Sequence, residues 1–189
     1  MKRTTSETKI SLSLTIDGAG NSKVETGIAF FDHMLDQLAR HSSMDIDLTA
    51  RGDLEIDTHH TVEDVGLALG EAISTALGEK TGIARYGHSI VPMEDALVLC
   101  AIDLSGRPYL ARDIPVPVEK VGDLDVASVN EFFRAVVNRG GLTLHSRLLD
   151  GTDPHHIIEG EFKAFAVALS RAIAVVDGRG VPSTKGVLE

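Results

Sequence analysis

Two short motifs in this sequence bring together residue types that bind metal ions. His59-His60-Thr61-Val62-Glu63 and His155-His156-Ile157-Ile158-Glu159 share the pattern His-His-x-x-Glu. On a helix, the first histidine and the glutamate are i,i+4 neighbours, and the two histidines point about 100° apart. One helix start can therefore offer an imidazole and a carboxylate to one metal ion and a second imidazole to another. Imidazole with carboxylate suits Mn, Fe and Zn, and the absence of nearby cysteine argues against a structural zinc knuckle.

A single motif of this kind has an ordinary structural explanation. Adjacent histidines often only solvate a helix end, and a glutamate in the first turn complements the helix dipole. For one copy, we favour that explanation by roughly two to one. Two copies at matching places of a repeated sequence reverse these odds, so we interpret both motifs as metal-binding helix starts.

The repeat extends beyond the motifs. A shift of 96 residues aligns His59 with His155, and the surrounding sequence then matches as well. The other aligned pairs are Arg51 with Arg147, Glu63 with Glu159, Ala68 with Ala164, Ala72 with Ala168, and Leu77 with Ile173. Such self-similarity indicates one folding unit used twice.

Residues on the preceding helices are further ligand candidates. His33 lies on a predicted helix of the first half, and Glu131 occupies the counterpart position in the second half. Either side chain could complete a coordination sphere. The neighbouring Asp32 could hydrogen-bond a metal-bound imidazole.

Hydrophobic periodicity predicts the elements that must position these residues. We expect strands at 6–16, 45–50, 54–56, 89–91, 96–104 and 142–148, and helices at 31–41, 58–77, 126–138 and 157–176. Residues 17–21 read as a hairpin-like turn, after which 22–26 could return as a strand. Residues 109–118 read as an extended edge or irregular strand, because Pro115 and Pro117 cannot donate to a sheet.

This order predicts an α+β fold made of an internally duplicated unit. Each unit is too small to enclose a core alone, so we expect helices packed between two mixed β-sheets as a sandwich. No linker composition separates the halves. We therefore expect one domain over residues 1–189, made of two pseudo-repeats at about 1–92 and 93–189.

Composition excludes several classes of function. The net charge of −10 argues against a general nucleic-acid binder. The longest apolar run, Ala96 to Ile102, is far shorter than the ~20 residues of a membrane span, and no signal peptide is evident. The single cysteine, Cys100, cannot form an internal disulfide. We expect a cytoplasmic protein that does not associate with membranes.

A few basic and hydroxyl residues could hold an anionic substrate. They are Arg85, Arg107, Lys163, and the tail residues Ser183, Thr184 and Lys185. Arginine, lysine and hydroxyl groups together suit a phosphate. The tail segment is not a Walker loop, because it lacks the upstream glycine spacing and the following helix.

Five separated segments resemble the imidazoleglycerol-phosphate dehydratases of histidine biosynthesis. They are Phe31-Asp32-His33-Met34-Leu35, His59-His60-Thr61-Val62-Glu63-Asp64, Asp103-Leu104-Ser105-Gly106-Arg107-Pro108-Tyr109, residues 155–165, and Val181-Pro182-Ser183-Thr184-Lys185-Gly186. Together they span nearly the whole chain in the family's order. The likeness covers the dehydratase alone, without the phosphatase domain that some members carry.

The resemblance implies a helical layer between two sheets and two Mn²⁺ ions per active site. It places those sites at contacts between subunits of a homo-oligomer of 24 chains. The implied metal ligands are His33, His59, His60, Glu63, His155, His156 and Glu159. Some members have a ligand histidine where this chain has Glu131, and a carboxylate can replace it on Mn²⁺.

The resemblance also assigns roles in the reaction. Glu7 is the implied acid/base, beside the histidines and glutamates of both motifs. The implied phosphate and substrate residues are Arg85, Arg107, Lys163, Ser183, Thr184 and Lys185, with His41 and Asp36 near the substrate. The implied reaction converts D-erythro-imidazole-glycerol phosphate into imidazole-acetol phosphate. Metal ions at the imidazole ring would favour loss of the hydroxyl, and Glu7 would then remove a proton from the next carbon.

Three other interpretations remain open. A dimetal hydrolase of a phosphorylated small molecule would use its metals to activate water. A ferritin-like store would need Glu-x-x-His motifs on a four-helix bundle, and a non-catalytic assembly protein would need no substrate site. The anion-binding residues argue against the last two. We expect structural roles for His88 and His145.

Overall fold

The computed structural model describes residues 1–178, 180–184, 186 and 188. Within them, the helices are α1 (Ala29–Ser42), α2 (His59–Leu77), α3 (Val126–Gly140) and α4 (Pro154–Ile173). The strands are β1 (Lys2–Thr4), β2 (Thr8–Thr15), β3 (Ser22–Glu25), β4 (Asp45–Gly52), β5 (Tyr86–Met93), β6 (Ala96–Asp103), β7 (Tyr109–Asp113), β8 (Lys120–Val121), β9 (Leu124–Asp125) and β10 (Thr143–Asp150). No helix in this part of the chain is long and apolar enough to cross a membrane.

The two four-stranded sheets have the same topology. The first has the order β1-β2-β4-β3, and the second has the order β5-β6-β10-β7. In each sheet the first three strands pair antiparallel, and the fourth strand runs parallel to its neighbour. Strand β5 is thus the counterpart of β1. The predicted duplication and the mixed character of both sheets are confirmed.

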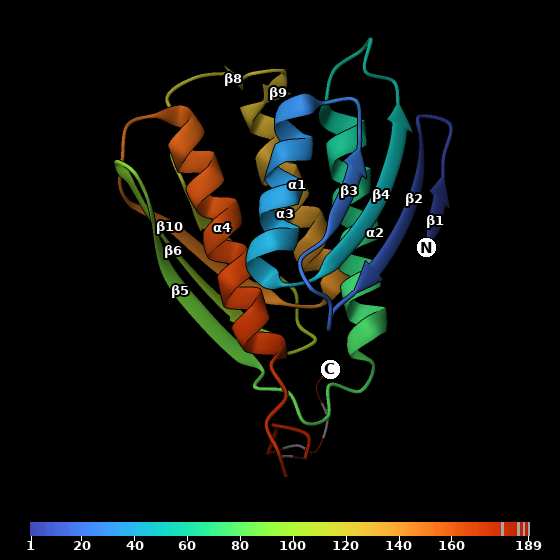
Figure 1. The fold of residues 1–189 in the computed structure, drawn as a ribbon, viewed down its shortest axis with the longest axis vertical. Coiled ribbons are helices and arrows are strands. Elements are labelled where there is room, and N and C mark those ends of the chain that lie inside the picture. The colour runs from blue at the N-terminus through green and yellow to red at the C-terminus, as the bar shows by residue number, and fades with distance from the viewer. Residues whose placement is uncertain (179, 185, 187, 189) are drawn as a thin grey trace.

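Helices fill the space between the two sheets (Figure 1). Helix α2 packs on β2 and β4, whereas α4 packs on β5 and β6. The other two helices cross between the repeats, because α1 packs on α4 and α3 packs on α2. All four helices begin at the same end of the molecule, the end at which β8 and β9 lie (Figure 1). The predicted α+β sandwich is confirmed.

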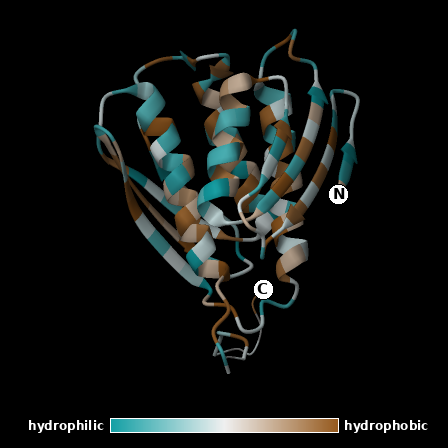
Figure 2. Cartoon of the chain, viewed as in Figure 1, coloured by the Kyte–Doolittle hydropathy of each residue, from teal (hydrophilic) through white to brown (hydrophobic). Residues whose placement is uncertain are grey.

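Strand alternation and an aromatic cluster explain how the layers hold together. In β2, the buried Ile10 and Leu12 alternate with the exposed Ser11 and Ser13, and Figure 2 shows such alternation along the strands. Between the sheets, neighbouring phenylalanine rings from α1, α3 and α4 lie 5.1–5.4 Å apart, at the spacing favoured by aromatic pairs. These fully buried residues are Phe31, Phe132, Phe133, Phe162 and Phe165.

The predicted hairpin after the turn at 17–21 was wrong. Strand β3 does form, but it pairs in parallel with β4 and not with β2. The Asp45 carboxylate accepts hydrogen bonds from the backbone nitrogens of Ala19 (2.9 Å) and Asn21 (2.8 Å). These bonds hold the loop against the beginning of β4. Strand β3 therefore pairs with the edge of β4 that faces away from β2.

Other boundaries also differ from the prediction. Residues 54–56 form a turn closed by a 2.9 Å hydrogen bond from Ile56 N to Asp53 O, and Ile56 is 65% exposed. The extended segment after Tyr109 ends at Asp113, well before residue 118. Helix α4 begins at Pro154 and not at 157, and it ends at 173 and not at 176.

A buried ion pair anchors α4 on the second sheet near the metal-binding motif. Arg112 on β7 makes two hydrogen bonds with Glu161 on α4, of 2.9 and 2.8 Å. Ser146 on β10 donates a third, of 3.1 Å, to the same carboxylate. The Glu161 side chain is fully buried, so its charge depends on these partners.

We therefore expect the variant Arg112→Ala to lose about 3–5 kcal/mol of unfolding free energy, because it leaves the Glu161 carboxylate buried and unpaired. The matched control is Arg147→Ala, which breaks an exposed pair with Asp113 and should cost less than about 1 kcal/mol. Urea denaturation followed by circular dichroism measures both. Equal, small losses in the two variants would show that α4 does not rely on the buried pair.

Candidate metal centre

The second motif opens helix α4 and is fixed there by a side-chain cap. The Asp153 carboxylate accepts hydrogen bonds from the backbone nitrogens of His155 (2.8 Å) and His156 (3.1 Å). Pro154 occupies the first turn, where a missing N–H has no cost. One turn later, Glu159 Oε2 lies 3.0 Å from His155 Nε2. The cap thus orients the imidazole and the carboxylate together.

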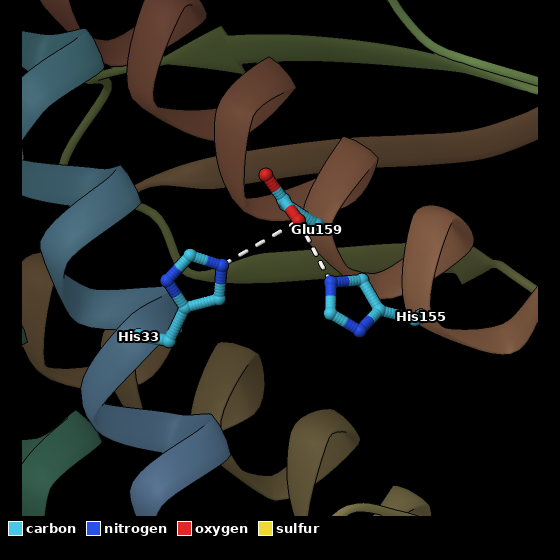
Figure 3. Close-up of side chains that lie close together, drawn as sticks. All are labelled: His33, His155 and Glu159. Carbon is cyan, nitrogen blue, oxygen red and sulfur yellow. Dashed lines mark hydrogen bonds and ion pairs between the residues drawn. The ribbon is translucent and has the colours of Figure 1, made fainter.

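Helix α1 adds a third potential ligand from the other repeat. His33 Nε2 lies 3.6 Å from Glu159 Oε2, and Figure 3 shows the His33 and His155 rings directed at the same carboxylate. In the described residues, one ligand atom from each of these three side chains lies within 4.8 Å of the others. The Phe30 ring packs edge-on against His155 at 5.0 Å. Packing of α1 on α4 therefore assembles a three-residue cluster.

The charge state of Glu159 suits a cation. The residue is 5% exposed, and burial by itself raises the pKa of a carboxyl group. Lys163 outweighs this effect, because its Nζ lies 2.6 Å from Glu159 Oε1, and the pKa of Glu159 falls below its ordinary value. Burial and the nearby Lys163 charge also lower the pKa of His41. Glu159 thus remains an ionised carboxylate, and His41 favours its neutral form.

These donors fit a divalent metal ion. Two imidazole nitrogens and one carboxylate oxygen form a common donor set for Mn, Fe and Zn in proteins. The side chains of His33 and His155 are 43% and 46% exposed, so the cluster is open on one side to further ligands. His33, His155 and Glu159 would hold such an ion.

The first motif is less complete within one chain. His59 Nε2 lies 3.5 Å from Glu63 Oε2 at the start of α2, and both side chains are more than 40% exposed. The backbone nitrogen of His59 donates to Asp57 at 2.8 Å, which matches the role of Asp153 in the other repeat. The described part of the chain brings no third ligand atom into this pair.

Two candidates on the preceding helices have other partners. Glu131 on α3 pairs with Arg134 at 3.0 Å. It does not belong to the cluster formed by the described ligand residues. Asp32 Oδ1 accepts hydrogen bonds from the backbone nitrogen and hydroxyl of Thr26 at 2.9 and 2.6 Å, so Asp32 secures the turn before α1. Its support of a metal-bound imidazole stays a prediction.

Glu7 lies in the turn between β1 and β2, facing the first motif. Its Oε1 is 4.0 Å from His60 Nε2, and half of its side chain is exposed. Asp64 fixes this turn on α2, because it accepts hydrogen bonds from Arg3 Nε at 2.9 Å and from the Thr8 hydroxyl. Arg3 and Thr8, on either side of Glu7 in the sequence, thus hold this turn on α2 and keep Glu7 beside His60.

The second histidine of each motif is bound differently from the first. His60 Nδ1 lies 2.9 Å from Asp53 Oδ2, and His156 Nδ1 lies 2.7 Å from Asp95 Oδ1. Neither aspartate was expected from the sequence as part of the site. Asp53 lies only seven residues before His60, so the sequence offered a weak indication of this contact. Asp95 lies 61 residues before His156, and the sequence offered no indication of that contact.

A pocket of about 570 Å³ collects several of the predicted anion-binding residues. Arg85, Arg107, Ser183 and Thr184 line it together with Tyr86, Pro182 and Leu188. Lys185 was also predicted for this site but lies outside the described residues. Lys163 is not part of the pocket lining and stands beside Glu159.

Arg85 is held in this pocket from two sides. Its Nε and Nη2 donate to the two oxygens of Asp103 at 2.7 and 3.1 Å, and its Nη1 donates to Pro182 O at 2.7 Å. The hydrogen bonds that Arg85 donates to the Asp103 carboxylate raise the pKa of Arg85, which is always charged. Sequence reasoning missed Asp103 as a partner, although Asp103 opens one of the recognised motifs.

The pocket and the metal cluster lie at opposite ends of α4. Arg85 N donates to Ala172 O at 2.9 Å, and Ala172 lies 17 residues after His155 on the same helix. At 1.5 Å per residue, that separation is about 25 Å. The two remaining histidines, His88 and His145, are exposed on β5 and β10, and neither lines this pocket or belongs to the cluster of described ligand residues.

Comparisons with known proteins agree with this geometry. The sequence profile of the family described as imidazoleglycerol-phosphate dehydratase matches residues 26–169. Imidazoleglycerol-phosphate dehydratase from Acetivibrio thermocellus is 56% identical over 189 residues, covering 100% of this chain and 97% of the relative. The protein of the same name from Microcystis aeruginosa is 52% identical, covering 100% and 91%.

Solved structures give the same result. IGPD from Pyrococcus furiosus superposes with a TM-score of 0.86 at 37% identity and covers the whole of both chains. Imidazoleglycerol-phosphate dehydratase from Staphylococcus aureus superposes with a TM-score of 0.83 at 37% identity, covering 93% of this chain and 98% of the other. Profile, relatives and structures concur, and the chain belongs to the imidazoleglycerol-phosphate dehydratase family.

Proposed function

We propose that this chain removes water from D-erythro-imidazole-glycerol phosphate to give imidazole-acetol phosphate, using Mn²⁺. The observation that carries the proposal is the convergence of His33, His155 and Glu159 in a member of this family. As a member of the family, the chain is a hydro-lyase of histidine biosynthesis.

Two Mn²⁺ ions per active site are part of the proposal. His33, His155 and Glu159 would hold one ion, and His59 with Glu63 would contribute to the other. His60 and His156 turn away from the glutamate of their own motif, so each is available to an ion held mainly by the other motif. Glu131 remains a proposed ligand, and it would have to leave Arg134 to bind a metal.

The distance between the two sites supports an active site built by more than one subunit. About 25 Å separates the Arg85 region from His155, which is far longer than a phosphorylated imidazole with six carbon atoms. This separation supports the proposal that the two ends of the substrate are held by different chains. We propose a homo-oligomer of 24 subunits, in which a phosphate pocket of one chain meets the metal ligands of its neighbours.

The chemistry follows from the groups that surround the substrate. Bound cations supply Lewis acidity to the imidazole ring. Glu7 takes the proton from the carbon next to the one that carries the leaving hydroxyl, and it stands within 4.0 Å of His60. Arg85, Arg107, Ser183, Thr184 and Lys185 hold the phosphate, and Lys163 and His41 flank the metal cluster near Glu159.

A dimetal hydrolase of a phosphorylated small molecule is the alternative for the same donor set. Family membership favours the dehydratase. We also propose that residues 1–189 form one domain of two pseudo-repeats, with the boundary before β5 at Tyr86 and not at the predicted 92/93. We propose that the chain acts in the cytoplasm.

The variant Glu159→Gln is expected to weaken Mn²⁺ binding by at least about 100-fold, since it removes a charged ligand and not only a group that orients one. Turnover should fall with metal occupancy, and EDTA should abolish it in the unmodified protein. The free Mn²⁺ signal in electron paramagnetic resonance measures binding. Glu25→Gln, at an exposed carboxylate paired with Arg51, is the control. Unchanged affinity in Glu159→Gln would remove this residue from the metal site.

The variant Glu7→Gln is expected to lower kcat by about 10²- to 10⁴-fold, as for loss of a general acid/base. Its Mn²⁺ content should match that of the unmodified protein, because Glu7 is not proposed as a ligand. Formation of the ketone product from imidazole glycerol phosphate gives the rate. Full turnover with unchanged metal content would assign the base to another residue.

The variant Arg107→Ala is expected to raise KM about 10- to 100-fold with a smaller change in kcat, because it removes a charge-assisted contact worth roughly 1.5–3 kcal/mol. Steady-state kinetics with the phosphorylated substrate measures this split. Arg147→Ala on the outer sheet face is the control and should leave KM unchanged. An unchanged KM in Arg107→Ala would place the phosphate elsewhere.

A further inference from the structure

The two histidines of each motif have different partners. In both repeats, the first histidine directs Nε2 at the glutamate of its own motif, at 3.5 Å for His59 and 3.0 Å for His155. The second histidine instead directs Nδ1 at an aspartate outside its helix. The same division of partners occurs twice, once in each repeat.

The aspartate contact leaves Nε2 of the second histidine pointing outward. His60 Nδ1 lies 2.9 Å from Asp53, and its Nε2 faces Glu7 at 4.0 Å. His156 Nδ1 lies 2.7 Å from Asp95, and its Nε2 faces Glu94 at 3.7 Å. A carboxylate that accepts Nδ1–H fixes the ring orientation and leaves the Nε2 lone pair for a metal ion.

Asp95 is itself held by the fold, and Asp53 is largely buried. Asp95 Oδ2 accepts hydrogen bonds from the backbone nitrogens of Thr152 (2.8 Å) and Asp153 (3.1 Å), in the segment that leads into α4. The side chain of Asp53 is only 16% exposed. Its Oδ1 is buried without a hydrogen-bond partner among the described residues, so His60 is the partner that this carboxylate has there.

The two aspartates do not derive from a common position in the repeat. The 96-residue shift places Leu149 opposite Asp53. The turn between β1 and β2, which corresponds to the turn carrying Asp95, contains Thr5, Ser6 and Glu7 but no aspartate. The carboxylate therefore comes from the connection between β4 and α2 in the first repeat, and from the connection between β5 and β6 in the second. An aspartate thus contacts Nδ1 of the second histidine in both repeats, although the two aspartates occupy unrelated positions. This recurrence indicates that the orientation of the second imidazole ring is important.

We propose that Asp53 and Asp95 are positioning residues, which aim His60 Nε2 and His156 Nε2 at the metal ion held mainly by the other motif. The inference rests on the proposed metal-dependent function and deepens it. The aspartates touch neither metal nor substrate. They act by restricting each imidazole to one ring orientation and one tautomer.

Mn²⁺ titration of four variants tests this role. Asp53→Ala and Asp95→Ala should each weaken Mn²⁺ binding about 10- to 100-fold, the range typical for a residue that orients a ligand. Asp53→Asn and Asp95→Asn should retain part of the affinity, because the amide oxygen still accepts Nδ1–H. Asp47→Ala, at an exposed carboxylate on β4, is the matched control and should bind as the unmodified protein does.

Two further measurements separate orientation from folding. Pulsed electron paramagnetic resonance should count fewer imidazole nitrogens on Mn²⁺ in the alanine variants. Urea unfolding of the metal-free proteins should change by less than the metal affinity does. Unmodified affinity in both alanine variants overturns the proposal, and so does an affinity loss matched by equal destabilisation of the metal-free protein.

The outcome is also distinct from failure of the proposed function. A chain that binds Mn²⁺ in an aspartate-dependent way, yet does not dehydrate imidazole glycerol phosphate, upholds this inference and refutes the function. A chain that does not bind Mn²⁺ at all refutes both.

Discussion

Helix α1 of the first repeat lies against α4 of the second, and α3 lies against α2 in the same way. The buried phenylalanines of α1, α3 and α4 fix the spacing of these three helices, because their rings pack at 5.1–5.4 Å and leave little freedom to slide. The packing of α1 on α4 then brings His33 to Glu159, 126 residues further along the chain. Neither repeat could form the three-residue cluster alone.

Pairing of carboxylates with basic groups secures the elements around the site. The chain carries a net charge of −10, so unpaired acidic groups near the helix starts would repel one another. Several carboxylates in these elements have a basic partner, and every pair named next, except the last, joins two segments of the chain. The pairs are Arg3 with Asp64, Arg85 with Asp103, Arg112 with Glu161, and Lys163 with Glu159. The last of these keeps the pKa of the candidate ligand Glu159 below its ordinary value, so that the side chain is an ionised carboxylate.

The sequence predicted those parts of the fold that depend on local periodicity. Both motif helices, the duplication and the layered arrangement follow from apolar spacing and from the repeated His-His-x-x-Glu pattern. The pairing of β3 with β4 could not be predicted in this way. It depends on hydrogen bonds from the loop before β3 to Asp45, which lies 24 residues after Asn21. The start of α4 was within reach, since Asp153-Pro154 is an ordinary helix-capping pair.

Partners that are distant in sequence limited the prediction of the site. His33 and the two motifs were recognisable by residue type, but Asp95 gives no sequence signal for its contact with His156, 61 residues away. Asp103 was visible within a motif, yet its bidentate contact with Arg85 depends on how β6 lies beside the start of β5. Such contacts depend on tertiary packing, which periodicity does not report.

The separation of the proposed phosphate pocket from the proposed metal ligands along α4 has a consequence for oligomers that contain two different variants of the chain. Suppose that each active site takes its pocket from one chain and its metal ligands from another. In an oligomer that mixes a pocket-defective variant with a ligand-defective variant, some contacts would then join an intact pocket of one chain to intact ligands of the other. Two inactive proteins could then restore activity together, as in complementation between alleles of a single gene.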